Sequence, residues 1–267
     1  DPLTQPLPFT PFKDFTGRSI NEINLYSTEM SSALCSIDRV SASANMNNRL
    51  SEAIVEAYKS TNGTPISFEL MLKCYQSRMK DANNDDSISS VLKQLVNAHI
   101  FESEDKVSLI DDSYIIKMDG YPKDGPIAKA IVYFLMSKLN NIYELLDKQA
   151  VNDEVVQIRH FSIIDEAHYM LDFDNRPLRN LIAVGRNKGL SIILATQNMS
   201  SFKSKGFDFY ANAQYPLIMK QQTIDDKVIK DLFGVSGQEL QEIRTAIAGL
   251  QKGELIIKDQ MAFALGM

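Results

Sequence analysis

Short apolar runs rich in β-branched residues recur through the second half of the chain, and they limit the possible fold more than any other feature. Segments with the 3.6-residue spacing of amphipathic helices separate most of these runs. Short apolar strands that alternate with helices are typical of a mostly parallel sheet flanked by helices. The sequence therefore predicts an α/β fold, with strands at YIIKM (114–118), FSII (161–164), LSIILAT (190–196), YPLIM (215–219) and ELIIK (254–258).

Individual residues mark the ends of the intervening helices. Pro126 suits the first turn of a helix whose apolar face is formed by Ile127, Ile131, Leu135, Ile142 and Leu146. Pro177 is expected to open a second helix, and Gly189 to close it in the left-handed conformation. Ser236 and Glu239 have the spacing of a capping box at the start of a third helix.

Residues 1–112 follow a different pattern. Four prolines fall within the first twenty residues, so residues 1–27 are predicted to form an extended lead-in. Apolar residues then recur with helical spacing, which predicts a mostly helical insertion over 28–112 and leaves 113–267 as the core. The segment NAHIFESEDKVSLIDD (97–112) leaves two structures open. It forms either a hairpin, as in a DNA-reading winged helix, or simple helical packing, which its acidic character favours.

The predicted helices of the insertion each have one apolar face. The first is formed by Leu50, Ile54, Ala57 and Tyr58, the second by Phe68, Met71, Leu72, Tyr75 and Met79, and the third by Ile88, Val91, Leu92 and Leu95.

Charge and composition exclude some classes of protein. The net charge of −6 argues against a broad nucleic-acid-binding face, although a few loops lining a pore remain compatible with it. Residues 176–207 carry six basic residues and no acidic one, which also fits a solvated basic surface. No apolar run is long enough to span a membrane, and the N-terminus is not a signal peptide. Cys35 and Cys74 stand alone, so we expect reduced thiols in a cytoplasmic protein.

Polar side chains follow two of the predicted strands. Asp165 and Glu166 come directly after one strand, and Thr196, Gln197 and Asn198 follow the next. Ligands of open parallel sheets collect beyond the carboxyl ends of the strands, so these side chains are expected to converge if the strands are neighbours. Two acids and an amide suit phosphoryl transfer to water, with one acid near Mg²⁺ and the other at the attacking water. Alternatively, the two acids only begin a helix.

Four stretches resemble the HerA/FtsK class of ring-forming DNA motor ATPases. HFSIIDEAHYML and VGRNKGLSIILATQ are similar to its Walker B and sensor region, YIIKMDGYP to the strand before Walker B, and GLQKGELIIKD to the closing strand. The resemblance covers residues 113–267 and implies a RecA-like fold. Over the whole chain, the sequence resembles the HerA-like ATPases of phosphorothioation-dependent DNA restriction systems.

The resemblance also implies roles for single residues. Asp165 would hold Mg²⁺ through water, Glu166 would polarise the lytic water, and Gln197 would be the sensor amide, with Thr196 beside the nucleotide. Arg186, or else Lys188, would reach the nucleotide of the next subunit, although a cation near a helix C-terminus also simply favours the helix dipole. Lys203 and Lys205 would contact DNA phosphates in the ring pore.

The implied cofactors and partners follow from the same class. They are ATP and Mg²⁺, the DNA backbone without sequence preference, other copies of the protein in a ring, and other subunits of a restriction complex.

One element of the class is missing from the sequence. No phosphate-binding loop of the form GxxxxGK(S/T) occurs, and the chain does not begin with Met. The expectation is that the chain begins after that loop, so that alone it neither binds ATP tightly nor hydrolyses it. Two alternatives remain: a catalytically inactive RecA-like module that binds a partner subunit, and a winged-helix reader over 28–112 fused to an α/β domain. The DEAH helicases are a weaker match, because the sequence lacks their Ser-Ala-Thr and arginine-rich motifs.

Overall fold

The fold was analysed in a computed structural model, which describes residues 1–37, 42–81, 84–152, 155–171, 173–197, 199–204, 207–213 and 215–257. The chain forms two compact units, with residues 1–162 and 173–191 in the first and residues 163–172 and 192–267 in the second. The predicted division into lead-in (1–27), insertion (28–112) and core (113–267) follows other boundaries than these two units, and it stays a prediction.

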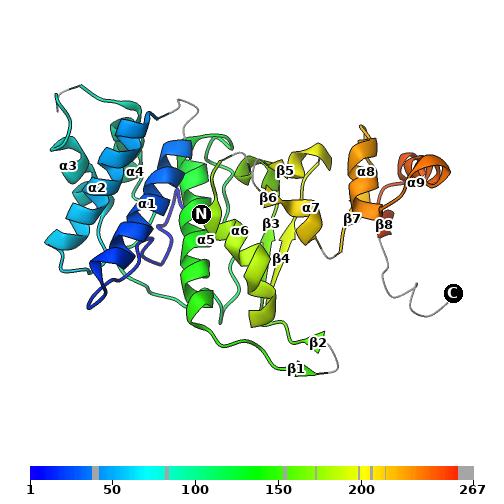
Figure 1. The fold of residues 1–267 in the computed structure, drawn as a ribbon, viewed down its shortest axis with the longest axis horizontal. Coiled ribbons are helices and arrows are strands. Elements are labelled where there is room, and N and C mark those ends of the chain that lie inside the picture. Colours follow the sequence, from blue (N-terminus) through cyan, green and yellow to red (C-terminus); the bar gives the residue numbers. More distant parts are fainter. Residues whose placement is uncertain are drawn as a thin grey trace. The chain divides into compact units, whose positions relative to one another are not determined.

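The first unit is mainly helical (Figure 1). Its helices are α1 (Ile20–Ile37), α2 (Ala44–Ser60), α3 (Phe68–Gln76), α4 (Ser87–Ala98), α5 (Pro126–Leu145), α6 (Arg176–Val184) and the 3-10 helix η2 (Gly185–Lys188). Two short strands, β1 (Val151–Asn152) and β2 (Val155–Val156), pair antiparallel. The strands β3 (His160–Ile164) and β4 (Leu190–Leu194) begin in this unit and end in the second.

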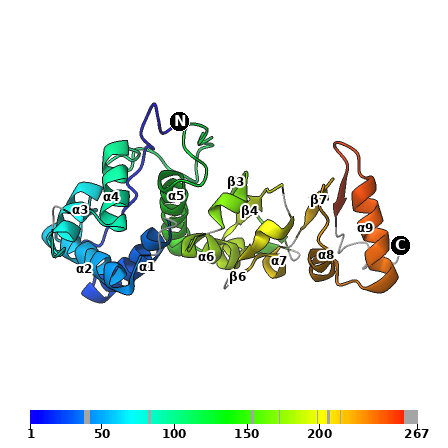
Figure 2. The same cartoon turned by 90° about the horizontal axis from the view of Figure 1, so that it is seen from above.

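Apolar periodicity selected the buried faces of α2 and α4 correctly, but only Ile131 of the face predicted for α5 is buried. On α3, Phe68, Met71 and Tyr75 are buried, whereas Leu72 is half-buried. α1 packs on α2, α2 on α3 and α3 on α4, while α5 contacts α1, α4 and α6 (Figure 2). The predicted face of α2 is fully buried, and so are Ile88, Val91, Leu92 and Leu95 of α4. Pro126 lies in the first turn of α5, and Gly189 adopts the left-handed conformation that closes η2, as predicted.

The lead-in belongs to the core of the first unit. Leu7, Phe9, Phe12 and Phe15 are all buried. Leu7 forms a parallel bridge with Phe101, in which the Leu7 amide donates to the Ile100 carbonyl at 2.6 Å. The segment after α4 therefore pairs with the lead-in, and no hairpin forms over 97–112. Beyond Ala98, the last residue of α4, the segment forms turns and this single bridge rather than a helix.

One predicted strand is absent. Residues 114–118 have no regular secondary structure, and the side chain of Ile115 is 87% exposed. A strand needs a neighbour for its backbone hydrogen bonds, and none of the described residues pairs with this run. Its apolar, β-branched composition gave the wrong prediction here, because it reports compatibility with a sheet rather than the presence of a partner.

The second unit contains short elements. They are the 3-10 helices η1 (Ala167–Met170) and η3 (Met199–Phe202), the strands β5 (Lys203–Ser204), β6 (Phe207–Asp208), β7 (Leu217–Met219) and β8 (Leu255–Ile257), and the helices α7 (Phe209–Asn212), α8 (Asp226–Phe233) and α9 (Gly237–Gly249). β5 pairs antiparallel with β6, and β7 pairs antiparallel with β8. The expected strands at 215–219 and 254–258 thus form as shorter elements, with Lys258 outside the described residues.

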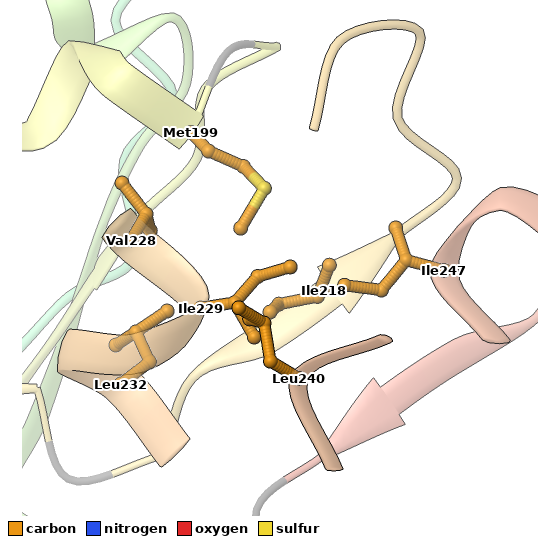
Figure 3. Close-up of a cluster of buried hydrophobic side chains, with 7 residues drawn as sticks. All are labelled: Met199, Ile218, Val228, Ile229, Leu232, Leu240 and Ile247. Carbon is orange, nitrogen blue, oxygen red and sulfur yellow. The ribbon is translucent and has the colours of Figure 1, made fainter. Parts of the chain in front are cut away.

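A small apolar core holds β7, α8 and α9 together. Figure 3 shows its seven buried side chains, Met199, Ile218, Val228, Ile229, Leu232, Leu240 and Ile247. Ser236 is the N-cap of α9, but its side chain makes no capping hydrogen bond, so the predicted capping box with Glu239 does not form.

Candidate active site

Backbone hydrogen bonds join the carboxyl ends of β3 and β4. The Ala195 amide donates to the Ile164 carbonyl at 2.9 Å, and the Ala167 amide donates to the Ala195 carbonyl at 2.8 Å. At the other end, the Arg159 amide donates to the Gly189 carbonyl at 2.7 Å. Both strands therefore run in the same direction, and the residues after them meet at one edge, as the sequence predicts.

The chain turns sharply between β3 and η1. Glu166 adopts the left-handed conformation, with φ 52° and ψ 41°. Oδ1 of Asp165 accepts a hydrogen bond from the Glu166 amide at 2.9 Å, and the Glu166 carbonyl accepts one from the Tyr169 amide at 3.1 Å. The two acids therefore form a tight turn ahead of a 3-10 helix. Such strain in a residue that is not glycine is common at functional sites.

The turn brings Glu166 against the residues after β4. Nε2 of Gln197 donates a hydrogen bond to Oε1 of Glu166. Oε2 of Glu166 is buried and accepts no hydrogen bond from the described residues, although His168 Nδ1 lies 3.4 Å away. His168 Nδ1 also lies 3.2 Å from Oγ1 of Thr196. Three residues expected at the site, Glu166, Thr196 and Gln197, thus lie together in the second unit.

His168 is the member of this group that the sequence analysis missed. The three histidines of the chain do not have the spacing of metal ligands, and that criterion identifies only ligands. The signal was the position of His168, two residues after Glu166 and directly behind the tight turn. Its ring also lies beside Tyr169, with a centroid distance of 4.1 Å.

The carboxylates at the strand ends are compatible with a magnesium ion that is bound together with a nucleotide. Asp165 is exposed. In the described part of the chain, no group of three His, Cys, Asp or Glu side chains is placed to bind a metal. Mg²⁺ at phosphate-transfer sites typically keeps several waters and takes only one or two carboxylates. An exposed carboxylate beside a buried carboxylate oxygen without a donor is compatible with that kind of binding.

The predicted basic residues have different surroundings. Arg186 lies in η2 in the first unit, where its side chain is exposed and makes no hydrogen bond or ion pair with the described residues. Lys188 Nζ instead donates to the Tyr143 and Glu144 carbonyls at the C-terminus of α5, at 2.5 and 3.0 Å. Arg176 pairs with Glu29 at 2.7 Å. Lys203 is in β5, while Asn198 and Lys205 lie outside the described residues.

The parallel strands and the helices that flank them have a RecA-like α/β fold. VirB4 of Thermoanaerobacter pseudethanolicus has this fold and matches 97% of this chain over 71% of its own length, at 17% identity and a TM-score of 0.64. The bacterial conjugative coupling protein TrwB, unbound, matches 94% of this chain over 69% of its own, at 12% identity and a TM-score of 0.50.

The plasmid coupling protein TrwB in complex with ADP and Mg²⁺ matches to the same extent, at 13% identity and a TM-score of 0.50. No protein-family model matches the sequence. No curated protein matches it significantly. Across the described helices, none is both long and apolar enough to cross a membrane.

Proposed function

We propose that this chain carries the hydrolytic half of the active site of an ATP-driven DNA motor. The observation that supports this most directly is the Glu166 carboxylate. It lies beyond two parallel strands, one oxygen is bonded to Gln197, and the other is buried without a donor. A carboxylate held in this way is suited to orient or deprotonate a water molecule. The RecA-like fold supports the same function, as does the solved complex of TrwB with ADP and Mg²⁺.

Each of the site residues has a role in this proposal. Asp165 holds Mg²⁺ through a water molecule, and Mg²⁺ when bound neutralises charge on the nucleotide phosphates. Glu166 activates the attacking water, while Gln197 fixes the Glu166 carboxylate and senses the terminal phosphate. Thr196 lies on the nucleotide side of the site. Arg186 reaches the nucleotide of a neighbouring subunit, which its side chain allows because it is exposed and pairs with none of the described residues.

The finer proposal concerns the biological system. The sequence resemblance points to the ATPase part of DptH, the HerA-like protein of phosphorothioation-dependent restriction. The motor would then act as a homo-oligomeric ring with other subunits of a restriction complex, in the cytoplasm, where Cys35 and Cys74 stay free. Lys203 and Lys205 would contact the DNA backbone without reading its sequence. This part of the proposal rests on the sequence resemblance alone.

A second candidate function is a catalytically inactive RecA-like module that binds a partner subunit. The observation in its favour is the absence of GxxxxGK(S/T) from the sequence. In that case Asp165 and Glu166 only form the turn before η1. The two functions differ in whether hydrolysis depends on Glu166.

The deciding experiment measures ATP turnover with duplex DNA on the protein in its full native length. Glu166→Gln should lower kcat by at least about a hundredfold, because it removes the general base while keeping the shape of the side chain. Arg186→Ala should also lower kcat. A mixture of the two inactive variants should regain part of the activity, because some interfaces then combine an intact Glu166 with an intact Arg186.

Each alternative result has a definite meaning. DNA-stimulated turnover that Glu166→Gln leaves intact would overturn the motor assignment of this site. An assembled, folded protein without turnover would favour the partner-binding module. Failure of the mixture to regain activity would contradict the role of Arg186 at the nucleotide of a neighbouring subunit. The role of Glu166 would be unaffected.

A further inference from the structure

The ring nitrogen Nδ1 of His168 has two polar neighbours on different segments of the site. Oγ1 of Thr196, after β4, lies 3.2 Å away, and Oε2 of Glu166, after β3, lies 3.4 Å away. Both distances exceed the usual length of a strong hydrogen bond, about 2.9 Å. One imidazole nitrogen carries either one proton or one lone pair. The two neighbours therefore compete for the same atom, and a small rotation of the ring favours one of them.

The Glu166 carboxylate needs the contact with His168 more than Thr196 does. Its Oε1 atom already accepts from Gln197, whereas Oε2 is buried and accepts no hydrogen bond from the described part of the chain. A buried charged oxygen without a donor is costly. A protonated Nδ1 that turned toward Oε2 would satisfy it and would fix both oxygens of the carboxylate.

We infer that His168 is a positioning residue that couples Thr196 to the Glu166 carboxylate. In this proposal the Nδ1 proton is donated to Oγ1 of Thr196 in the free site. When a ligand takes the Thr196 hydroxyl, the same N–H turns and donates to Oε2 of Glu166. The carboxylate is then held at both oxygens, by His168 and by Gln197, in the orientation that activates water. This inference rests on the proposed function, because it assumes that Thr196 contacts the nucleotide and that Glu166 is the general base. Nucleotide binding at Thr196 would then orient Glu166.

The geometry makes His168 suitable for this role. Its side chain is 29% exposed and that of Glu166 is 24% exposed, so both are partly shielded from solvent. His168 lies in η1, whose Ala167 amide is bonded to the Ala195 carbonyl next to Thr196. The three side chains therefore belong to two segments that a backbone hydrogen bond joins. Only the His168 ring has to rotate to change its partner.

The first test needs no ATPase activity. The chain has three histidines, so ring ¹⁵N spectra of the purified chain contain only three imidazoles, and loss of one set in His168→Asn assigns His168. Thr196→Val and Glu166→Gln should each shift the Nδ1 resonance of His168, because the first removes the hydroxyl beside Nδ1 and the second replaces the charged carboxylate with a neutral amide. Asp165→Asn is the matched control, since it neutralises the adjacent carboxylate, which makes no contact with His168. Shifts no larger than in this control would overturn the inference.

The second test is kinetic and uses the full-length protein. His168→Ala should lower kcat about tenfold to a hundredfold at unchanged KM for ATP, because a displaced catalytic group slows the chemical step. His168→Asn places an amide near the position of Nδ1 and should recover part of kcat, whereas His168→Gln places it near Nε2 and should not. If His168 were merely structural, its substitution would instead lower the melting temperature, and His168→Asn and His168→Gln would have the same kcat.

The outcomes separate the inference from the proposed function. If Glu166→Gln abolishes turnover while His168→Ala has no effect, the coupling is overturned and the motor assignment stands. If the wild-type protein has no turnover, the proposed function fails, and the catalytic role of His168 fails with it.

Discussion

At the scale of single residues, Glu166 has an unfavourable backbone conformation and is also the proposed general base. Its φ of 52° lies in the left-handed region that side chains with a Cβ atom avoid. The turn directs its carboxylate toward Gln197 and His168, so the same backbone conformation carries the strain and places the proposed general base. A helical start at this residue would direct the side chain elsewhere.

A comparison of two substitutions at Glu166 measures this strain. Glu166→Gly and Glu166→Ala both remove the carboxylate, but only alanine keeps the left-handed strain. We expect the glycine variant to be more stable by about 1 kcal/mol in urea unfolding of the purified chain. The same pair at the exposed helical residue Glu242 in α9 should have the opposite order, because glycine weakens helices. Higher stability of alanine at both positions would contradict the left-handed assignment.

At the scale of elements, the helix starts differ in how well they are capped. Asp86 at the start of α4 accepts from the Ser89 amide at 2.9 Å, and the Asp86 amide donates to the Ser89 hydroxyl at 2.9 Å. Oδ2 of Asp86 also accepts from the Tyr75 hydroxyl at 2.7 Å and from Arg49 at 3.2 Å. Asp86 therefore joins α2, α3 and α4, whereas Ser236 at the start of α9 makes no side-chain cap.

Alanine substitutions at these two caps should have unequal effects. Asp86→Ala should lower the free energy of unfolding by about 2 to 4 kcal/mol, because it removes a cap and leaves Tyr75 and Arg49 without their acceptor. Ser236→Ala should change it by less than about 0.5 kcal/mol. Urea denaturation followed by circular dichroism gives both values. Equal losses would mean that the cap of α4 and its links to α2 and α3 are not formed in solution.

At the scale of the whole molecule, the first unit buries many groups that titrate at high pH. Burial raises the pKa of the Cys35 thiol to about 12, with a smaller contribution from the negative charge of Asp86. Burial likewise raises the pKa of Tyr26, Tyr58 and Tyr133. All these groups favour their neutral forms in the folded chain. On the acid side, burial lowers the pKa of His160, which lies near Tyr143.

These shifts predict a stability maximum near neutral pH. The unfolded chain ionises its thiols near pH 8.5 and its tyrosines near pH 10, so stability is constant below these values and falls as pH rises toward 12. For His160 the stabilisation is present above about pH 6.5 and is lost as pH falls through its folded pKa. Urea unfolding midpoints measured from pH 5 to pH 10.5 test both the predicted loss of stability at acid pH and the predicted loss at alkaline pH. Cys35→Ala should make stability fall less steeply above pH 8.5, and an unchanged slope would show that the half-buried Cys35 thiol is not shielded from solvent.

The sequence by itself determined the features that depend on neighbours a few residues away. Periodicity gave the buried faces of α2 and α4, and the apolar runs gave β3 and β4 together with the polar residues at their ends. The same reasoning placed Pro126 and Gly189 correctly, because a proline or glycine has a local conformational preference wherever it occurs.

Only the tertiary structure decided which distant segments meet. Leu7 pairs with the segment after α4, Lys188 caps α5, and His168 lies between Glu166 and Thr196. The run at 114–118 has the composition of a strand but no partner among the described residues. The physical reason is the same in each case. A contact between remote segments depends on how the whole unit packs, and the spacing of residues along the chain does not predict that packing.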